Sequence, residues 1–201
     1  VAGDEQNYPA SIALDYARID VAGSASQIDS ENKTITLGGK NTNPDAPSKA
    51  TLNPVFGAAD DIWFFDFTGK QTVTTEDGGG WRRFSVTTTD SNVGFLFIYN
   101  TDDTKAAVGT VRTIAQDNLA GDADQIKLPE FCNTLAQLQA GVKFRIEKEG
   151  TAITLYAAGA DEAFVKIAET ACGADDAGKI SFRGCYDTWQ FSGFTLTREE
   201  A

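Results

Sequence analysis

The sequence contains no histidine among its 201 residues, and this absence limits the chemistry that its side chains can perform. It excludes Ser-His-Asp and Cys-His catalysis, zinc sites built on histidine, and the commonest general base near neutral pH. An enzyme would have to use carboxylates, lysine, tyrosine or arginine. Glu147 and Glu149 share a strand face but sit at a turn among basic residues, and Asp122 and Asp124 lie in a loop. We expect all four to be solvated and predict that the protein is not an enzyme.

Aromatic side chains are stronger candidates, because an exposed ring can stack on the apolar face of a sugar. Trp81 follows three glycines at the expected tip of a hairpin, where an indole can be exposed. Trp63 and Tyr99 belong to stretches that are apolar on both strand faces, so one set of side chains must meet a ligand or a second layer; burial beneath a long loop is the alternative. Four charged residues could add hydrogen bonds to hydroxyl or carboxylate groups of a ligand. They are Arg82, Arg83, Arg112 and Asp102.

Three cysteines, Cys132, Cys172 and Cys185, allow one disulfide and one free thiol. None of them has a metal-ligand spacing. We favour a disulfide between Cys172 and Cys185, which flank one expected strand, although the backbone between them must bend back to join them. Three separate buried thiols are the alternative.

Acidic turns supply oxygen ligands of the kind that calcium prefers. The candidate turns are Asp60–Asp61, Asp102–Asp103 and Asp122–Asp124, and none of them matches an EF-hand loop. We retain Ca²⁺ as a candidate cofactor, with solvated turns as the alternative.

The chain is acidic, with 17 Lys plus Arg against 29 Asp plus Glu and a net charge of −12. Such a surface repels the phosphates of nucleic acids and of anionic membranes. No stretch approaches the roughly 18 consecutive apolar residues of a membrane-spanning helix. We predict no nucleic-acid partner and no membrane insertion. The sequence starts without a signal peptide or methionine, so we expect a mature chain or a domain from a larger multidomain protein.

Alternation of apolar and polar residues dominates the sequence and predicts strands. Residues 62–67 and 93–100 are apolar on both faces and predict central strands, and Gly193 predicts a bulge in the last strand. Helical spacing occurs near 133–140, where we expect one or two turns. The remaining strands are short and joined mostly by tight turns. The sequence therefore predicts one all-β domain over residues 1–201, an antiparallel two-sheet β-sandwich.

Two segments resemble a known superfamily. KFRIEKEGTAITLYAAG followed by AFVKIAET spans residues 143–170, and GKISFRGCYDTWQFSGFTLT spans residues 178–197. They resemble the C-terminal half of concanavalin A-like (laminin G-like) jelly rolls, in which a Gly-Lys-Ile strand follows such a meander and a Phe-x-x-Phe-x-Leu strand closes the sandwich. The likeness covers residues 142–198 well and 60–114 loosely. It implies a concanavalin A-like jelly roll.

The superfamily includes lectins, carbohydrate-binding modules, adhesin domains, glycoside hydrolases and polysaccharide lyases, so the fold does not choose the function. Its hydrolases usually carry a Glu-x-Asp-x-Glu or Glu-x-x-Asp strand, and this sequence has neither. The resemblance implies a non-catalytic carbohydrate-binding (lectin-like) or adhesin module, extracellular or at the cell surface, with a glycan or cell-surface polysaccharide as partner. The alternatives are a structural or protein-binding domain, and an enzyme that uses carboxylates.

Overall fold

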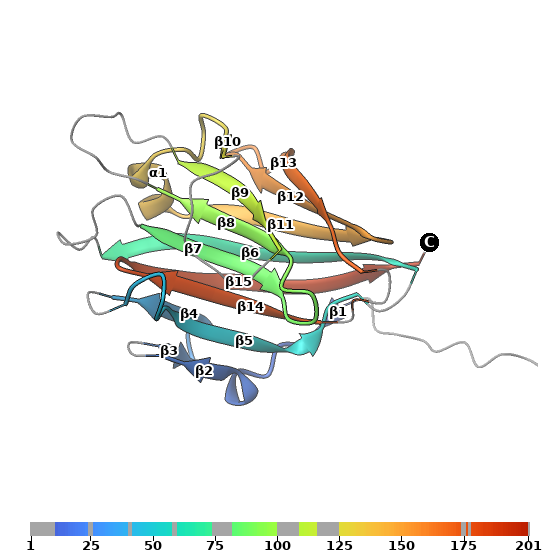
Figure 1. Ribbon diagram of the computed structural model, residues 1–201, viewed down its shortest axis with the longest axis horizontal. Helices are drawn as coiled ribbons and strands as arrows, with labels where there is room; N and C mark the ends of the chain where they lie inside the picture. Colours follow the sequence, from blue (N-terminus) through green and yellow to red (C-terminus); the bar gives the residue numbers. More distant parts are fainter. Residues whose placement is uncertain are drawn as a thin grey trace, which may run out of the picture.

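Two sheets face each other in the computed structural model and form a β-sandwich (Figure 1). The structure describes residues 11–23, 26–39, 42–57, 60–73, 82–99, 109–115, 125–173, 176 and 178–200. Every strand pairing within these residues is antiparallel. The predicted fold class, an all-β antiparallel sandwich, is confirmed.

The described strands divide into a sheet of eight, called sheet A, and a sheet of seven, called sheet B. Sheet A has the order β13 (Phe164–Ala171), β12 (Ala152–Ala158), β11 (Val142–Glu149), β6 (Ile62–Val73), β15 (Thr188–Glu199), β4 (Thr34–Gly38) and β3 (Gln27–Asp29), and β1 (Ser11–Ile12) pairs with β15. Sheet B has the order β10 (Ile126–Lys127), β9 (Thr110–Ile114), β8 (Gly94–Ile98), β7 (Arg83–Thr88), β14 (Lys179–Cys185), β5 (Ser48–Val55) and β2 (Asp20–Ala22).

Two short helices complete the described elements. The 3₁₀ turn η1 (Tyr16–Arg18) follows β1, and α1 (Leu135–Ala140) precedes β11. The second is the helix that the sequence predicts near 133–140. Thr134 caps it by accepting from the backbone N–H of Gln137, and Gly141 ends it at a φ of 99°. In the described part of the chain, no helix has the length and apolar character needed to cross a membrane.

Strands β14 and β15 are consecutive in the chain but belong to different sheets (Figure 1). Strand β14 lies between β7 and β5, and β15 lies between β6 and β4. The register of β15 shifts between Ser192 and Thr195, where Gly193 has a φ of 63°. This is the predicted bulge, and glycine adopts that left-handed conformation without steric cost.

The strands that are apolar on both faces have one face in the main core. In β6, Trp63, Phe65 and Phe67 belong to that core. In β8, Phe95 and Phe97 point into it, whereas Leu96 and Ile98 form a second buried cluster on the opposite face. The second set is therefore also buried rather than open to solvent.

Stacked and edge-on phenylalanine rings fill the space between the sheets. The rings of Phe67 and Phe182, from opposite sheets, meet edge to face with centroids 5.1 Å apart. Phe182 also lies 4.5 Å from Phe191, and Phe84 stacks on Phe97 at 4.4 Å. Such pairs add about 0.5–1.5 kcal/mol each beyond the apolar area that they bury. The contacts of Phe182 with Phe67 and Phe191 join sheet B to sheet A, whereas Phe84 and Phe97 stack within sheet B.

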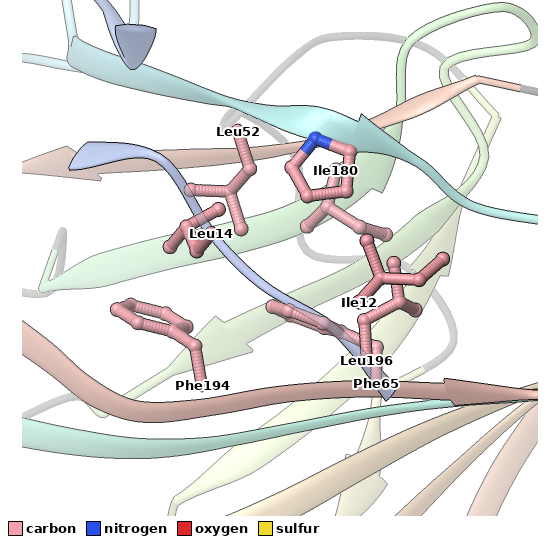
Figure 2. A pocket seen from close by; sticks show the side chains of 8 residues that line it. Ile12, Leu14, Leu52, Phe65, Ile180, Phe194 and Leu196 are labelled. Atoms are coloured by element: carbon pink, nitrogen blue, oxygen red, sulfur yellow. The ribbon is translucent and has the colours of Figure 1, made fainter. Parts of the chain in front are cut away.

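A crevice between the sheets is closed by the segment that follows β1. Figure 2 shows Ile12 and Leu14 among side chains of both sheets, with Phe194 at one side. The remaining cavity is about 10 Å³, room for about one water molecule. This crevice is part of the apolar core and does not offer space to a ligand. Its lining residues are Ile12, Leu14, Leu52, Pro54, Phe65, Ile180, Phe194 and Leu196.

Candidate functional site

Two aromatic residues that the sequence predicts to bind ligand lie in the core. Trp63 is 6% exposed and Tyr99 is 1% exposed. The Tyr99 hydroxyl donates to the carbonyl of Cys132 at 2.8 Å, and burial raises the pKa of this hydroxyl well above its ordinary value. A sugar cannot stack on either ring in this structure, because both side chains are buried, and the guanidinium of Arg198 lies over the Trp63 ring at 5.6 Å. The stacking role predicted for these two residues is therefore corrected to a core role.

Two other predicted ligand-binding residues, Trp81 and Asp102, lie outside the described residues. Their roles stay predictions.

Arg82 belongs to a buried polar network. Its Nε lies 3.0 Å from a carboxylate oxygen of Asp187, whose side chain is 0% exposed. The same oxygen accepts from Gln71 at 2.6 Å, and Gln139 donates to Gln71 at 2.7 Å. Because a buried carboxylate is costly unless it is paired and hydrogen-bonded, we assign Arg82 to stabilising the β14–β15 connection against β6 and α1.

The remaining predicted arginines, Arg83 and Arg112, lie on the outer face of sheet B. Register pairs Arg83 with Ile98, and Arg112 with Leu96, on neighbouring strands. The sequence analysis missed two further cations on this face, Lys49 and Arg183, which pair with each other across β5 and β14. The signal was present in the alternation of β14, which places Arg183 on the face opposite Phe182.

A groove of about 370 Å³ opens beside α1, at the end of β11 and β12. It contains Phe131, which is 36% exposed, between polar side chains of separate elements. Gly159 approaches the Phe131 ring closely: a Cβ added there would lie 3.7 Å from it. Pockets for small ligands typically occupy about 300–1,000 Å³ and combine apolar surface with a few polar groups. The polar side chains of the lining are Gln137, Lys143 and Glu162.

Helix α1 positions this groove. The Gln137 side chain accepts from the backbone N–H of Thr134 at 3.0 Å and donates to the carbonyl of Glu130 at 2.7 Å. These two bonds fix the loop that carries Phe131. The sequence analysis did not identify this site, although an aromatic residue directly after a polar, acidic connection was a readable signal.

The candidate catalytic pair lies on the outer face of sheet A. Glu147 and Glu149 alternate with buried residues of β11, as predicted. The pKa of Glu147 is raised, mainly because its carboxyl group is partly buried. The negative charge of Glu149 raises this pKa further, whereas the positive charge of Arg145 lowers it.

The described acidic residues do not fit a calcium site. Asp61 forms an ion pair with Arg198, so its carboxylate is already engaged. In the ranges that the structure describes, no three Asp, Glu or Cys side chains converge as metal ligands. The turns Asp102–Asp103 and Asp122–Asp124 lie outside those ranges.

The three cysteines are buried free thiols, so the predicted disulfide between Cys172 and Cys185 is wrong. Cys172 follows β13 at the edge of sheet A, and its backbone N–H bonds to Thr151. Cys185 ends β14 in the centre of sheet B, opposite Arg83. The two residues are therefore associated with different sheets, one at the edge of sheet A and the other inside sheet B.

Known structures resemble this sandwich, whereas no family model and no curated protein matches the sequence. The lectin from Bauhinia forficata in complex with GalNAc has a TM-score of 0.62 at 10% identity, covering 90% of this chain and 93% of the lectin. The exoplasmic/lumenal domain of VIP36, bound to Ca²⁺ and Man2, has a TM-score of 0.62 at 11% identity, covering 96% and 88%. Peanut lectin has a TM-score of 0.58 at 13% identity, covering 96% and 97%.

Identities of this size establish the fold and leave the function open. The chain has the concanavalin A-like lectin fold, as the resemblance of residues 142–198 implied.

Proposed function

We propose that this chain is a non-catalytic carbohydrate-binding module of a secreted or cell-surface protein. The observation that carries the proposal is the groove beside α1, where a partly exposed phenylalanine lies among polar side chains on a lectin fold. The module would be one domain of a larger protein.

The groove offers the two contacts that sugar recognition needs. The exposed face of Phe131 can stack on the C–H face of a pyranose ring. Lys143 can donate to sugar hydroxyls, and Glu162 can accept from them. Gly141 and Gly159 also line the groove, and because they lack side chains the sugar can approach the backbone there.

A glycan-array screen of the folded domain tests the proposal. We expect reproducible binding, and Phe131→Ala should weaken it at least about tenfold, the equivalent of 1.4 kcal/mol. The matched control is Val21→Ala, which also shortens an exposed apolar side chain but lies on β2 of sheet B. Equal loss in both variants would contradict the groove as the site.

The same screen with a chelator tests the calcium hypothesis. The acidic turns Asp102–Asp103 and Asp122–Asp124 are its remaining candidates. Loss of binding on chelation, restored by added Ca²⁺, would establish a calcium-dependent module. Unchanged binding in the presence of the chelator would show that glycan recognition does not require Ca²⁺.

A second candidate function, protein binding, is favoured by the outer face of sheet A. There Phe64 and Phe164 are both partly exposed, and they flank Arg145 at 5.0 and 4.2 Å. Aromatic and arginine side chains are enriched at protein interfaces. Silence of the folded domain across a broad glycan array would favour this function over carbohydrate binding.

A further inference from the structure

The outer face of sheet B carries a continuous row of paired residues from five strands. Arg183 of β14 lies opposite Lys49 of β5 on one side and opposite Ser85 of β7 on the other. Ser85 in turn lies opposite Leu96 of β8, and Leu96 lies opposite Arg112 of β9. Directly paired side chains of an antiparallel sheet point to the same face, with Cβ atoms about 4.5–5.5 Å apart. The row is therefore one contiguous strip with cations at both ends. Its central residues Ser85 and Leu96 are buried, whereas Lys49 and Arg112 at the ends are partly exposed, so a ligand would have to enter from an end of the row.

The Lys49–Arg183 pair brings two positive charges together in a chain whose net charge is −12. Burial lowers the pKa of Lys49, and the charge of Arg183 lowers it further. Burial also lowers the pKa of Arg183. Like charges directly opposite on adjacent strands are destabilising, and a bound anion would relieve this repulsion.

Ser85 is an independent sign of a ligand. The residue is 1% exposed, and among the described residues its hydroxyl has no hydrogen-bond partner. Buried polar groups nearly always have a partner, because leaving one unsatisfied is destabilising. This hydroxyl lies on the same face as the guanidinium of Arg183, in the adjacent register position.

We propose that the Lys49–Arg183–Ser85 row binds the carboxylate group of an acidic sugar. The proposal rests on the proposed function as a carbohydrate-binding module and adds a ligand class to it. A guanidinium donates two parallel hydrogen bonds to a carboxylate, and the ammonium of Lys49 and the hydroxyl of Ser85 supply further donors. Each of the two cations also interacts within the chain, so the carboxylate would join or replace those interactions.

Neighbouring hydroxyl groups fit the rest of a sugar. Thr51 and Ser181, one pair further along β5 and β14, place their hydroxyl oxygens 3.4 Å apart on the same face. A hydroxyl can both donate and accept, so this pair can bind sugar hydroxyls of either orientation. Since the acidic surface elsewhere repels anions, this row would decide which acidic sugars the protein accepts.

Isothermal titration calorimetry with two trimers tests the proposal. The probes are a galacturonic acid trimer and a neutral galactose trimer, titrated into the folded protein at low ionic strength. We expect the acidic trimer to bind more tightly, and Lys49→Gln to weaken it at least about tenfold while leaving the neutral trimer unchanged. The matched control is Lys70→Gln, which removes the same charge from an exposed position on sheet A and should change neither titration.

Arg183→Gln is a second variant, with the larger expected loss of the acidic trimer. Because Arg183 is 9% exposed, its circular dichroism spectrum must first match the wild type. Lys49 is less buried, so Lys49→Gln keeps the test valid if Arg183→Gln does not fold.

The outcomes separate the row from the groove. Two results would contradict binding of the acidic trimer to the row. One is equal affinity of the wild type for the two trimers, and the other is equal weakening of acidic-trimer binding by Lys49→Gln and Lys70→Gln. If Phe131→Ala removes binding of both trimers and Lys49→Gln removes neither, the groove stands and the row fails. If Lys49→Gln alone removes the acidic trimer and Phe131→Ala has no effect, the row stands and the groove fails.

Discussion

Two arginines on the outer faces of the two sheets have opposite surroundings. Arg145 of sheet A donates from Nε and Nη2 to the two oxygens of Asp66, at 2.7 and 2.9 Å, and lies between two phenylalanine rings. The hydrogen bonding of Arg145 to Asp66 is the main reason that the pKa of Arg145 is raised. Arg183 of sheet B lies between Lys49 and Ser85, and burial lowers its pKa.

The difference shows that residue type alone does not identify a binding site. Arg145 has its carboxylate within the protein, so the pair stabilises sheet A. Arg183 has a like charge on one side and, on the other, a hydroxyl without a hydrogen-bond partner among the described residues. Arg183 also interacts within the chain, and an external carboxylate would join or replace that interaction. Residues in an environment like that of Arg183 are better candidates for ligand recognition, because a ligand bound there would stabilise the folded protein.

The largest expected effect concerns Cys185, which lies two residues beyond Arg183 on the same face of β14. Burial raises the pKa of this thiol to about 12, from a reference value of 9.0. At pH 8 the thiolate fraction is therefore about 1,000-fold lower than in the unfolded chain, and alkylation should be slowed at least that much. The rate should rise about tenfold per pH unit towards pH 12.

This labelling is measured by mass spectrometry in a Cys132→Ala/Cys172→Ala variant, with the urea-unfolded protein as reference. If the native and unfolded proteins are alkylated at the same rate at pH 8, Cys185 is exposed. Burial at this end of β14 would then no longer distinguish Arg183 from Arg145.

A smaller effect is expected when the sheet A pair is broken. Asp66→Ala leaves Arg145 without its carboxylate between the two rings, and we expect the free energy of unfolding to fall by about 1–2 kcal/mol. We expect a modest loss of unfolding free energy because the Arg145 side chain is 31% exposed, so water screens the ion pair. Urea denaturation measures this change.

The control for Asp66→Ala is Asp45→Ala, which removes an exposed carboxylate and should change stability by less than about 0.5 kcal/mol. In addition, Arg145→Met should lower the cost of Asp66→Ala, because no cation is then left unpaired. If the cost is the same in both backgrounds, the ion pair is not the stabilising interaction.

The smallest effect is a thermal shift. Galacturonate at a concentration several times its dissociation constant should raise the Tm by about 2–4 °C, relative to galactose at equal ionic strength. Lys49→Gln should abolish the difference, and Arg145→Gln should retain it. Loss of the shift in Arg145→Gln instead would move the anion site to sheet A.

Strand faces were largely predictable from the sequence, because alternation assigns side chains to one face or the other. Phe84 and Val86 point into the core and Ser85 points outward, as the period predicts. The helix near 133–140 and the bulge at Gly193 were also predicted, since capping and glycine conformations depend on local sequence.

Sites were much less predictable, because they depend on which strands become neighbours. Lys49 and Arg183 are far apart in the sequence, and only the pairing of β5 with β14 brings them together. Trp63 lies on a strand with two apolar faces, so alternation could not decide which face enters the core. The Cys172–Cys185 prediction failed for the same reason, since Cys172 follows β13 of sheet A whereas Cys185 ends β14 of sheet B.

The late position of β14 and β15 in the chain affects how the protein folds during synthesis. One completes sheet B between β7 and β5, and the other completes sheet A between β6 and β4. During synthesis, the strands on either side of these two positions emerge from the ribosome first and have open edges until residues 179–199 follow. The nascent chain therefore depends on these late strands to close both sheets, and a ribosome that stalls before them leaves an aggregation-prone intermediate for chaperones to protect.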